Sequence, residues 1–150
     1  MKWNRDTEAD LQAEFHHHCR LLGINCGLEY ETPVGTLDCL VISDDRRSGL
    51  AIVECKRPIN NPDHEKEHNR SILSSNQVSR YRTLGLPVFA LCCFESARPL
   101  AKKILQEVVQ PDAKYHRPVS LWEIRNAKPV VAKNRSSHIW YMRDQEAALN

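Results

Sequence analysis

Two runs of β-forming residues, at positions 37–42 and 50–56, flank a short polar segment rich in Ser, Asp and Arg. This pattern predicts an antiparallel hairpin, in which the start of the first strand lies beside the end of the second. Side chains two apart on a strand share a face, so Glu54 and Lys56 point the same way, while Asp38 shares its face with Leu40 and Ile42. The hairpin therefore gathers two carboxylates and an ammonium at one end of an otherwise apolar pair of strands.

This charged cluster has two interpretations. In the first, the charges mark solvated strand ends and Lys56 pairs with a carboxylate. In the second, Asp38, Glu54 and the backbone carbonyl of Cys55 supply the hard oxygen ligands that Mg²⁺ or Mn²⁺ prefers. Lys56 would then position or help deprotonate an attacking water, or offset charge that develops on a phosphate.

The composition predicts one ordinary globular domain spanning residues 1–150. The 150 residues are 41% hydrophobic and 27% charged, which suits a single domain with a proper core. The formal charge of +2, from 21 Lys and Arg against 19 Asp and Glu, is too small to indicate a nucleic-acid partner by itself. No apolar run approaches the length of a membrane span and the N-terminus lacks the apolar region of a signal peptide, so we expect a cytoplasmic protein with no membrane partner.

The six cysteines form no C-x-x-C pair, and four of them lie inside apolar, strand-like runs. Such thiols behave as small hydrophobic side chains, so we expect reduced, structural cysteines. An iron–sulfur cluster is the alternative. The run of His16, His17 and His18 cannot chelate one ion, because successive helix positions point in different directions; surface histidines are the simpler interpretation.

A first helix is predicted to begin after Thr7 or Asp6, either of which can cap it, and to end at Gly23. Its apolar positions recur at helical spacing: Leu11, Phe15, Cys19 and Leu22. Glu8 lies at the end of this stripe, where it either compensates the helix dipole or supplies a third carboxylate to the metal site. Glu14 is the second candidate for that role, since its helical angle places it away from the stripe.

The segments on either side of the hairpin are predicted to be mostly irregular structure. A turn and a short strand at residues 28–31 precede it. Residues 57–70 contain two prolines and almost nothing apolar, so we expect a long loop, either a binding loop or lid or simply a mobile segment.

A second helix is predicted after the Ser74-Ser75-Asn76 cap, closed by Gly85, and an apolar run at residues 88–94 predicts a strand buried on both faces. Gln77 and Tyr81 lie one turn apart on one face of this helix, beside Arg80 and Arg82. They either complete an amphipathic helix with Tyr81 half-buried, or place Gln77 near the attacking water or a phosphate, with Tyr81 and the arginines along a DNA backbone.

The sequence of the C-terminal part of the chain predicts an amphipathic helix at residues 99–110 and strands at residues 118–124, 129–132 and 138–142. These elements would extend the sheet or form a small appended subdomain. The end of the chain is basic and carries Trp140 and Tyr141, which could track a phosphate backbone or serve as structural aromatics.

In chain order, Glu8 on a helix, Gly35-x-x-Asp38, Glu54-x-Lys56 and Gln77-x-x-x-Tyr81 resemble the PD-(D/E)XK nuclease superfamily. The likeness is to its small phage-type members: virus-type replication-repair nucleases, Holliday-junction resolvases and RecB-like nuclease domains. It covers about residues 7–94. Leu37 replaces the proline of the family's motif and Cys55 fills its variable position, but neither change removes a side-chain ligand.

The resemblance implies an α/β fold with a restriction-endonuclease-like αβββαβ core, a mixed central β-sheet flanked by helices, and residues 95–150 as an extension. It implies a DNA nuclease that leaves a 5′-phosphate, acting in phage or bacterial DNA replication, repair or recombination. The expected metal ligands for Mg²⁺ or Mn²⁺ are Glu8, Asp38, Glu54 and the Cys55 carbonyl. The expected catalytic residues are Asp38, Glu54, Lys56 and Gln77, and the expected DNA contacts are Arg57, Arg80, Tyr81 and Arg82.

Two other classes of function stay open. One is a catalytically silent DNA-binding module of the same fold, and the other is a metal-binding or interaction protein with no nucleic-acid partner. Nucleases of this type often pair so that two sites face two strands. A homodimer is therefore compatible with the resemblance, although no coiled-coil pattern in the sequence identifies one.

Overall fold

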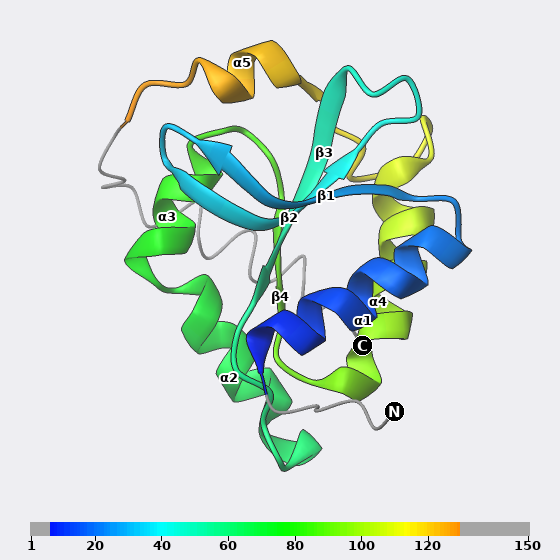
Figure 1. The fold of residues 1–150 in the computed structure, drawn as a ribbon, viewed down its shortest axis with the longest axis vertical. Helices are drawn as coiled ribbons and strands as arrows, with labels where there is room; N and C mark the ends of the chain where they lie inside the picture. The colour runs from blue at the N-terminus through cyan, green and yellow to red at the C-terminus, as the bar shows by residue number, and fades with distance from the viewer. Residues whose placement is uncertain (1–6, 130–150) are drawn as a thin grey trace.

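The computed structural model describes residues 7–129, which form helices and strands around one five-stranded sheet (Figure 1). In chain order the elements are α1 (Glu8–Leu21), β1 (Asn25–Thr32), β2 (Gly35–Ile42), β3 (Ser48–Cys55), α2 (Glu65–Leu73), α3 (Asn76–Arg82), β4 (Val88–Leu91), α4 (Ala97–Ile104), β5 (Val119–Ser120) and α5 (Leu121–Arg125). Within the described residues, no helix combines the length and apolar character needed to cross a membrane.

The sheet is mixed and has the strand order β1-β2-β3-β4, with β5 paired to β3. Strands β1, β2 and β3 are antiparallel neighbours, and β4 runs parallel to β3. Cys39 pairs with Val53, so the next residues along the two strands, Asp38 and Glu54, are neighbours at the end of the hairpin. The predicted hairpin and the predicted α/β class, a mixed sheet flanked by helices, are both confirmed.

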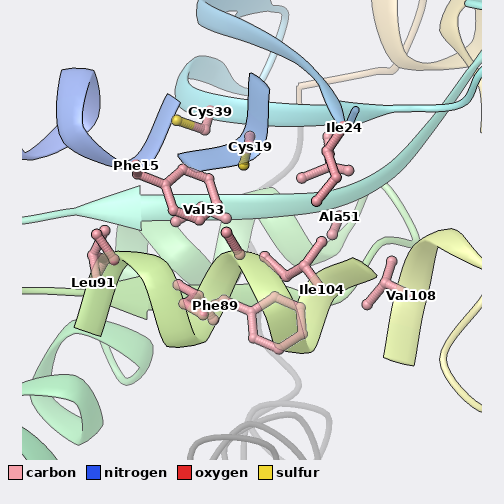
Figure 2. Close-up of a cluster of buried hydrophobic side chains, with 14 of the residues drawn as sticks. Phe15, Cys19, Ile24, Cys39, Ala51, Val53, Phe89, Leu91, Ile104 and Val108 are labelled. Carbon is pink, nitrogen blue, oxygen red and sulfur yellow. The ribbon is translucent and has the colours of Figure 1, made fainter. Parts of the chain in front are cut away.

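Helices cover both faces of this sheet, so the neighbouring strands β3 and β4 are almost entirely buried, although β4 lies at the end of the strand order. Figure 1 shows α1 and α4 on one side of the strands and α2 and α3 on the other. The first core lies under α1 and α4; Figure 2 shows Phe15, Val53, Phe89 and Ile104 meeting there. Burial on both faces explains why β4 reads as a continuous apolar run rather than an alternating one.

The second core lies under α2 and α3. Leu40 of β2, Ile52 of β3 and Ala90 of β4 face Leu73 of α2 and Val78 of α3. The residues of β3 alternate between the two cores, with Val53 on the first and Ile52 on the second. The side chain of Glu54 therefore lies on the α3 side of the sheet, where Gln77 and Tyr81 also lie.

Capping side chains fix where the first two predicted helices begin. The Thr7 hydroxyl accepts from the Asp10 backbone N–H at the start of α1, and the Ser75 hydroxyl accepts from the Val78 N–H at the start of α3. Each side chain satisfies a backbone donor that the helix itself leaves unpaired. The first two of the three predicted helices are therefore confirmed.

The prediction of a long loop at residues 57–70 was wrong. A 3-10 turn (Pro62–His64) and then helix α2 occupy most of this stretch. The Asn61 side chain accepts from the Asp63 N–H and starts the turn. The apolar residues that α2 buries in the second core, Ile72 and Leu73, lie beyond the polar stretch that indicated a loop, and the other buried residue of α2 is the polar Asn69.

Four further predictions differ from the structure in extent or type. The strand predicted at residues 88–94 is the shorter β4, which ends at Leu91. The strand predicted at residues 28–31 is the longer β1. The strand predicted at residues 118–124 is only the two-residue β5, because Ser120 caps α5 through the Glu123 N–H and Ile124 is buried in the second core. The helix predicted at residues 99–110 begins earlier, as α4, and continues in a π turn (Leu105–Val109). The strand predicted at residues 129–132 has only Pro129 within the described residues, and the strand predicted at residues 138–142 lies outside them.

Candidate functional site

Asp38 and Glu54 meet at the end of the β2–β3 hairpin. The Cys55 backbone N–H donates to Asp38 Oδ2 at 2.8 Å, which fixes the orientation of that carboxylate. Glu54 is only 1% exposed, and its Oε2 has no hydrogen-bond partner among the described residues. A buried carboxylate with an unpartnered oxygen is costly, and such groups gather at functional sites.

Lys56 connects this carboxylate pair to helix α3. Its Nζ lies 3.2 Å from Glu54 Oε1 and donates to Gln77 Oε1 at 3.1 Å. Gln77 Nε2 in turn donates to the Tyr81 hydroxyl at 2.7 Å, which donates to the Thr36 carbonyl at 2.8 Å. This chain of hydrogen bonds ties the ammonium to α3 and to β2, so the structure brings together four predicted catalytic residues: Asp38, Glu54, Lys56 and Gln77.

The electrostatics of the pair follow from burial and from like charge. Burial and the neighbouring Asp38 carboxylate raise the pKa of Glu54 to about 8, and Lys56 opposes the shift. Burial also raises the pKa of Asp38, opposed by the hydrogen bond from Cys55. Without a cation, the pair therefore retains a proton near neutral pH, as expected for two carboxyl groups in one partly desolvated site.

Glu8 lies close to the same end of the sheet. Its Oε1 accepts from the Arg57 backbone N–H at 3.2 Å, one residue beyond Lys56. Glu14, the competing candidate, lies 3.2 Å from His18 one turn further along α1. The contact with Arg57 places Glu8, rather than Glu14, beside the segment that carries the site.

The four residues predicted to contact DNA differ in their exposure to solvent. Arg57 is exposed and Arg80 is partly exposed, so both can meet a ligand. Tyr81 is fully buried, and Arg82 is 7% exposed and donates to the Leu73 carbonyl at 3.2 Å. The placement of Tyr81 and Arg82 supports a structural role for both, because neither side chain reaches the surface.

The donor set fits a hard divalent cation. Glu54 Oε2 has no hydrogen-bond partner within residues 7–129, and Asp38 carries a second carboxylate beside it. Mg²⁺ is commonly held by one or two carboxylates, with water and phosphate oxygens completing its shell. Among residues 7–129, no three His, Cys, Asp and Glu side chains are grouped for a metal ion. The remaining ligands would therefore be a backbone carbonyl, such as the predicted Cys55 oxygen, and oxygens from water or substrate.

The cysteines are free thiols, and all but Cys26 are buried. Burial raises the pKa of Cys92 to about 12 and that of Cys93 to about 11. Thiols with such pKa values stay protonated and unreactive at neutral pH. They behave as core residues, in line with the predicted structural role.

Thr36 is the contributor to this site that the sequence did not indicate. Its carbonyl accepts the Tyr81 hydroxyl from 45 positions away in the chain. Because the contact uses a backbone atom, no residue type marks it in the sequence.

Tyr81→Phe is expected to lower the free energy of unfolding by about 1–2 kcal/mol, because Gln77 loses an acceptor and the Thr36 carbonyl loses a donor. Urea unfolding would measure the change. Tyr30→Phe, at a half-buried tyrosine outside this hydrogen-bond chain, is the matched control. Equal stability of Tyr81→Phe and the parent protein would show that the chain contributes nothing to the fold.

Comparison of the chain with protein-family models, with curated proteins and with solved structures finds no match. The likeness to the nuclease superfamily therefore rests on the order of four motifs, and inferences about activity rest on the geometry of the site.

Proposed function

We propose that this protein is a Mg²⁺-dependent DNA nuclease, with Mn²⁺ as an alternative cation, that hydrolyses phosphodiester bonds and leaves a 5′-phosphate. The observation that carries the proposal is the convergence of Asp38, Glu54, Lys56 and Gln77 at one end of the sheet, with a buried, unpartnered oxygen on Glu54. Phage or bacterial DNA replication, repair or recombination is the proposed setting.

The element order supports the finer fold assignment that we propose, a restriction-endonuclease-like core. Helix α1, strands β1 to β3, helix α3 and strand β4 follow the αβββαβ order, with α2 inserted before α3. The candidate carboxylates lie on β2 and β3, the two strands of the antiparallel hairpin, and Gln77 lies on α3, the helix that precedes β4.

Each residue has a distinct part in the proposed hydrolysis. Water attacks phosphorus, the bond from phosphorus to the 3′ oxygen breaks, and a proton passes to that oxygen, which leaves a 3′-hydroxyl and a 5′-phosphate. The Lys56 ammonium has three N–H donors. Glu54 and Gln77 accept two of them, and the third N–H would donate to the attacking water or to charge developing on the phosphate. Tyr81 positions Gln77, and Gln77 positions Lys56.

Asp38 and Glu54 would hold the cation, with the Cys55 carbonyl as the further candidate. Glu8, expected from the sequence as a third carboxylate ligand, accepts from the Arg57 backbone N–H and is not grouped with the other two for a metal ion within residues 7–129. When bound, Mg²⁺ would supply Lewis-acid polarisation of the phosphate and would acidify the attacking water. A cation would also neutralise the repulsion between Asp38 and Glu54 that keeps the pair partly protonated in its absence.

Incubation of labelled single-stranded, duplex and branched DNA with the protein in Mg²⁺, Mn²⁺ or EDTA tests the proposal. We expect products with either cation and none in EDTA, and the 5′ ends should accept ligation without prior phosphorylation. A pure preparation that gives no products with any substrate and cation would contradict the proposal.

A silent DNA-binding module is the second candidate, favoured by the lack of a third grouped His, Cys, Asp or Glu side chain in residues 7–129. That module would bind DNA equally well in Mg²⁺ and in EDTA, with a steep dependence on salt concentration. Binding without products in the same samples would select it.

A further inference from the structure

A cavity of about 770 Å³ opens beyond the carboxyl ends of β3 and β4. Three segments supply its lining: the chain that leaves β3, the start of α2 and the chain that leaves β4. The residues used in the argument below are Arg57, Asn60, His64, His68, Phe94 and Glu95.

The cavity lies where two parallel strands send the chain to opposite faces of the sheet. From β3 the chain runs to α2, which packs on the second core, whereas from β4 it runs to α4, which packs on the first core (Figure 1). Backbone hydrogen bonds from Lys56 N–H to the Leu91 carbonyl and from Ile59 N–H to the Cys92 carbonyl hold the two departing segments together. Ligands of α/β proteins bind in the crevice that such a divergence creates.

This cavity is continuous in sequence with the candidate site. Arg57, in its lining, directly follows Lys56, and its backbone N–H is held by Glu8. A strand of nucleic acid with one phosphate at Lys56 would therefore have an adjacent nucleotide within reach of the cavity.

The chemistry of the lining suits a nucleotide. Arg57 supplies a permanent positive charge, and the half-buried Phe94 supplies an aromatic ring for stacking. His64, the N-cap residue of α2, and His68 lie about one helical turn apart and so face the same side of that helix. Their rings and the Asn60 amide can hydrogen-bond base edges or phosphate. The carboxylate of Glu95 accepts a hydrogen bond from the Cys93 thiol at 2.9 Å. At least one oxygen of this carboxylate is therefore already bound within the protein.

We propose that this cavity binds one unpaired nucleotide of a DNA strand beside the phosphodiester that is cut, so that the enzyme prefers single-stranded or frayed DNA to intact duplex. The inference rests on the proposed function, whose substrate it specifies. The volume of the cavity falls within the range of about 300–1,000 Å³ that is typical of ligand sites. A base within a duplex must leave the stack to enter such a site, whereas an unpaired base enters without that cost.

The test is fluorescence anisotropy with a labelled short oligothymidylate and a labelled blunt hairpin duplex, both in EDTA so that no cleavage intervenes. Phe94→Leu keeps apolar volume but removes the aromatic face, and His68→Ala changes an exposed residue of α2. We expect each variant to lose about tenfold in affinity for the oligothymidylate and to keep its affinity for the duplex. His17→Ala, at an exposed histidine of α1, is the matched control, and the thermal unfolding midpoint checks that each variant folds.

Unchanged affinity of His68→Ala and Phe94→Leu for the oligothymidylate, or equal losses for both DNA forms, would overturn the proposal. Cleavage in Mg²⁺, measured on the unmodified protein, reports on the nuclease separately. A protein that cleaves DNA but whose cavity variants bind normally would refute only the cavity, and a protein that never cleaves would refute the nuclease whatever the anisotropy shows.

Discussion

Lys56→Ala should lower the rate of Mg²⁺-dependent DNA cleavage about a thousandfold, within the range found when a positioned catalytic group is removed. The ammonium lies between Glu54 and Gln77, 3.2 Å from Glu54 Oε1. Its loss would leave the attacking water unpositioned and the phosphate charge without a partner. Single-turnover cleavage of labelled DNA measures the effect.

Lys102→Ala is the matched control, because Lys102 is an exposed lysine on α4. It should cleave at the parent rate, while both variants should unfold at similar temperatures. If Lys56→Ala retained the parent rate, Lys56 would be only a structural partner of Glu54 and the proposed chemistry would lose its central residue.

The second large effect concerns stability and pH. The pKa of Glu54 is raised from 4.5 to about 8, first by burial and then by Asp38. Between these two values the folded protein holds a proton that the unfolded chain has released. In EDTA, the free energy of unfolding should therefore fall as pH rises from about 4.5 to about 8, by at most about 1.4 kcal/mol per pH unit for this group, and then level off. The raised pKa of Asp38 acts in the same direction.

Glu54→Gln should flatten this pH dependence, because an amide cannot release the proton. We expect the variant to be more stable than the parent protein above about pH 8 and to cleave no DNA. Urea unfolding across the pH range in EDTA measures the first effect. Glu67→Gln, at an exposed residue of α2, controls for the change in net charge. Parallel pH curves for Glu54→Gln and the parent protein would mean that Glu54 is not the group responsible.

Much of the site could be predicted because its signals are local. The antiparallel hairpin was enough to bring Asp38 and Glu54 to the same end, and the two-residue repeat of strand side chains put Glu54 and Lys56 on one face. Capping residues in the sequence placed the starts of α1 and α3 to within one or two positions, and one helical turn set Gln77 beside Tyr81. Each inference used residues separated by a few positions or by one antiparallel pairing.

Other features had no local signal. Helix α2 was missed because its first residues are polar and its few apolar residues gain their burial only from the second core. Helix α5 was read as a strand, since nothing near Ile124 in the sequence reports that it packs against the sheet. The exposure of Tyr81 was overestimated, because its contact is with the backbone of Thr36.

The sequence by itself thus determined the hairpin, its charged end and the helices with caps, because hydrogen-bonding patterns and side-chain periodicity act between near neighbours. Tertiary structure alone decided that Glu54 is buried with a raised pKa, that Lys56 is tied to α3, and that a cavity opens where the chain leaves β3 and β4. Burial, desolvation and the divergence of two parallel strands depend on which distant segments pack together, and no stretch of residues encodes that packing on its own.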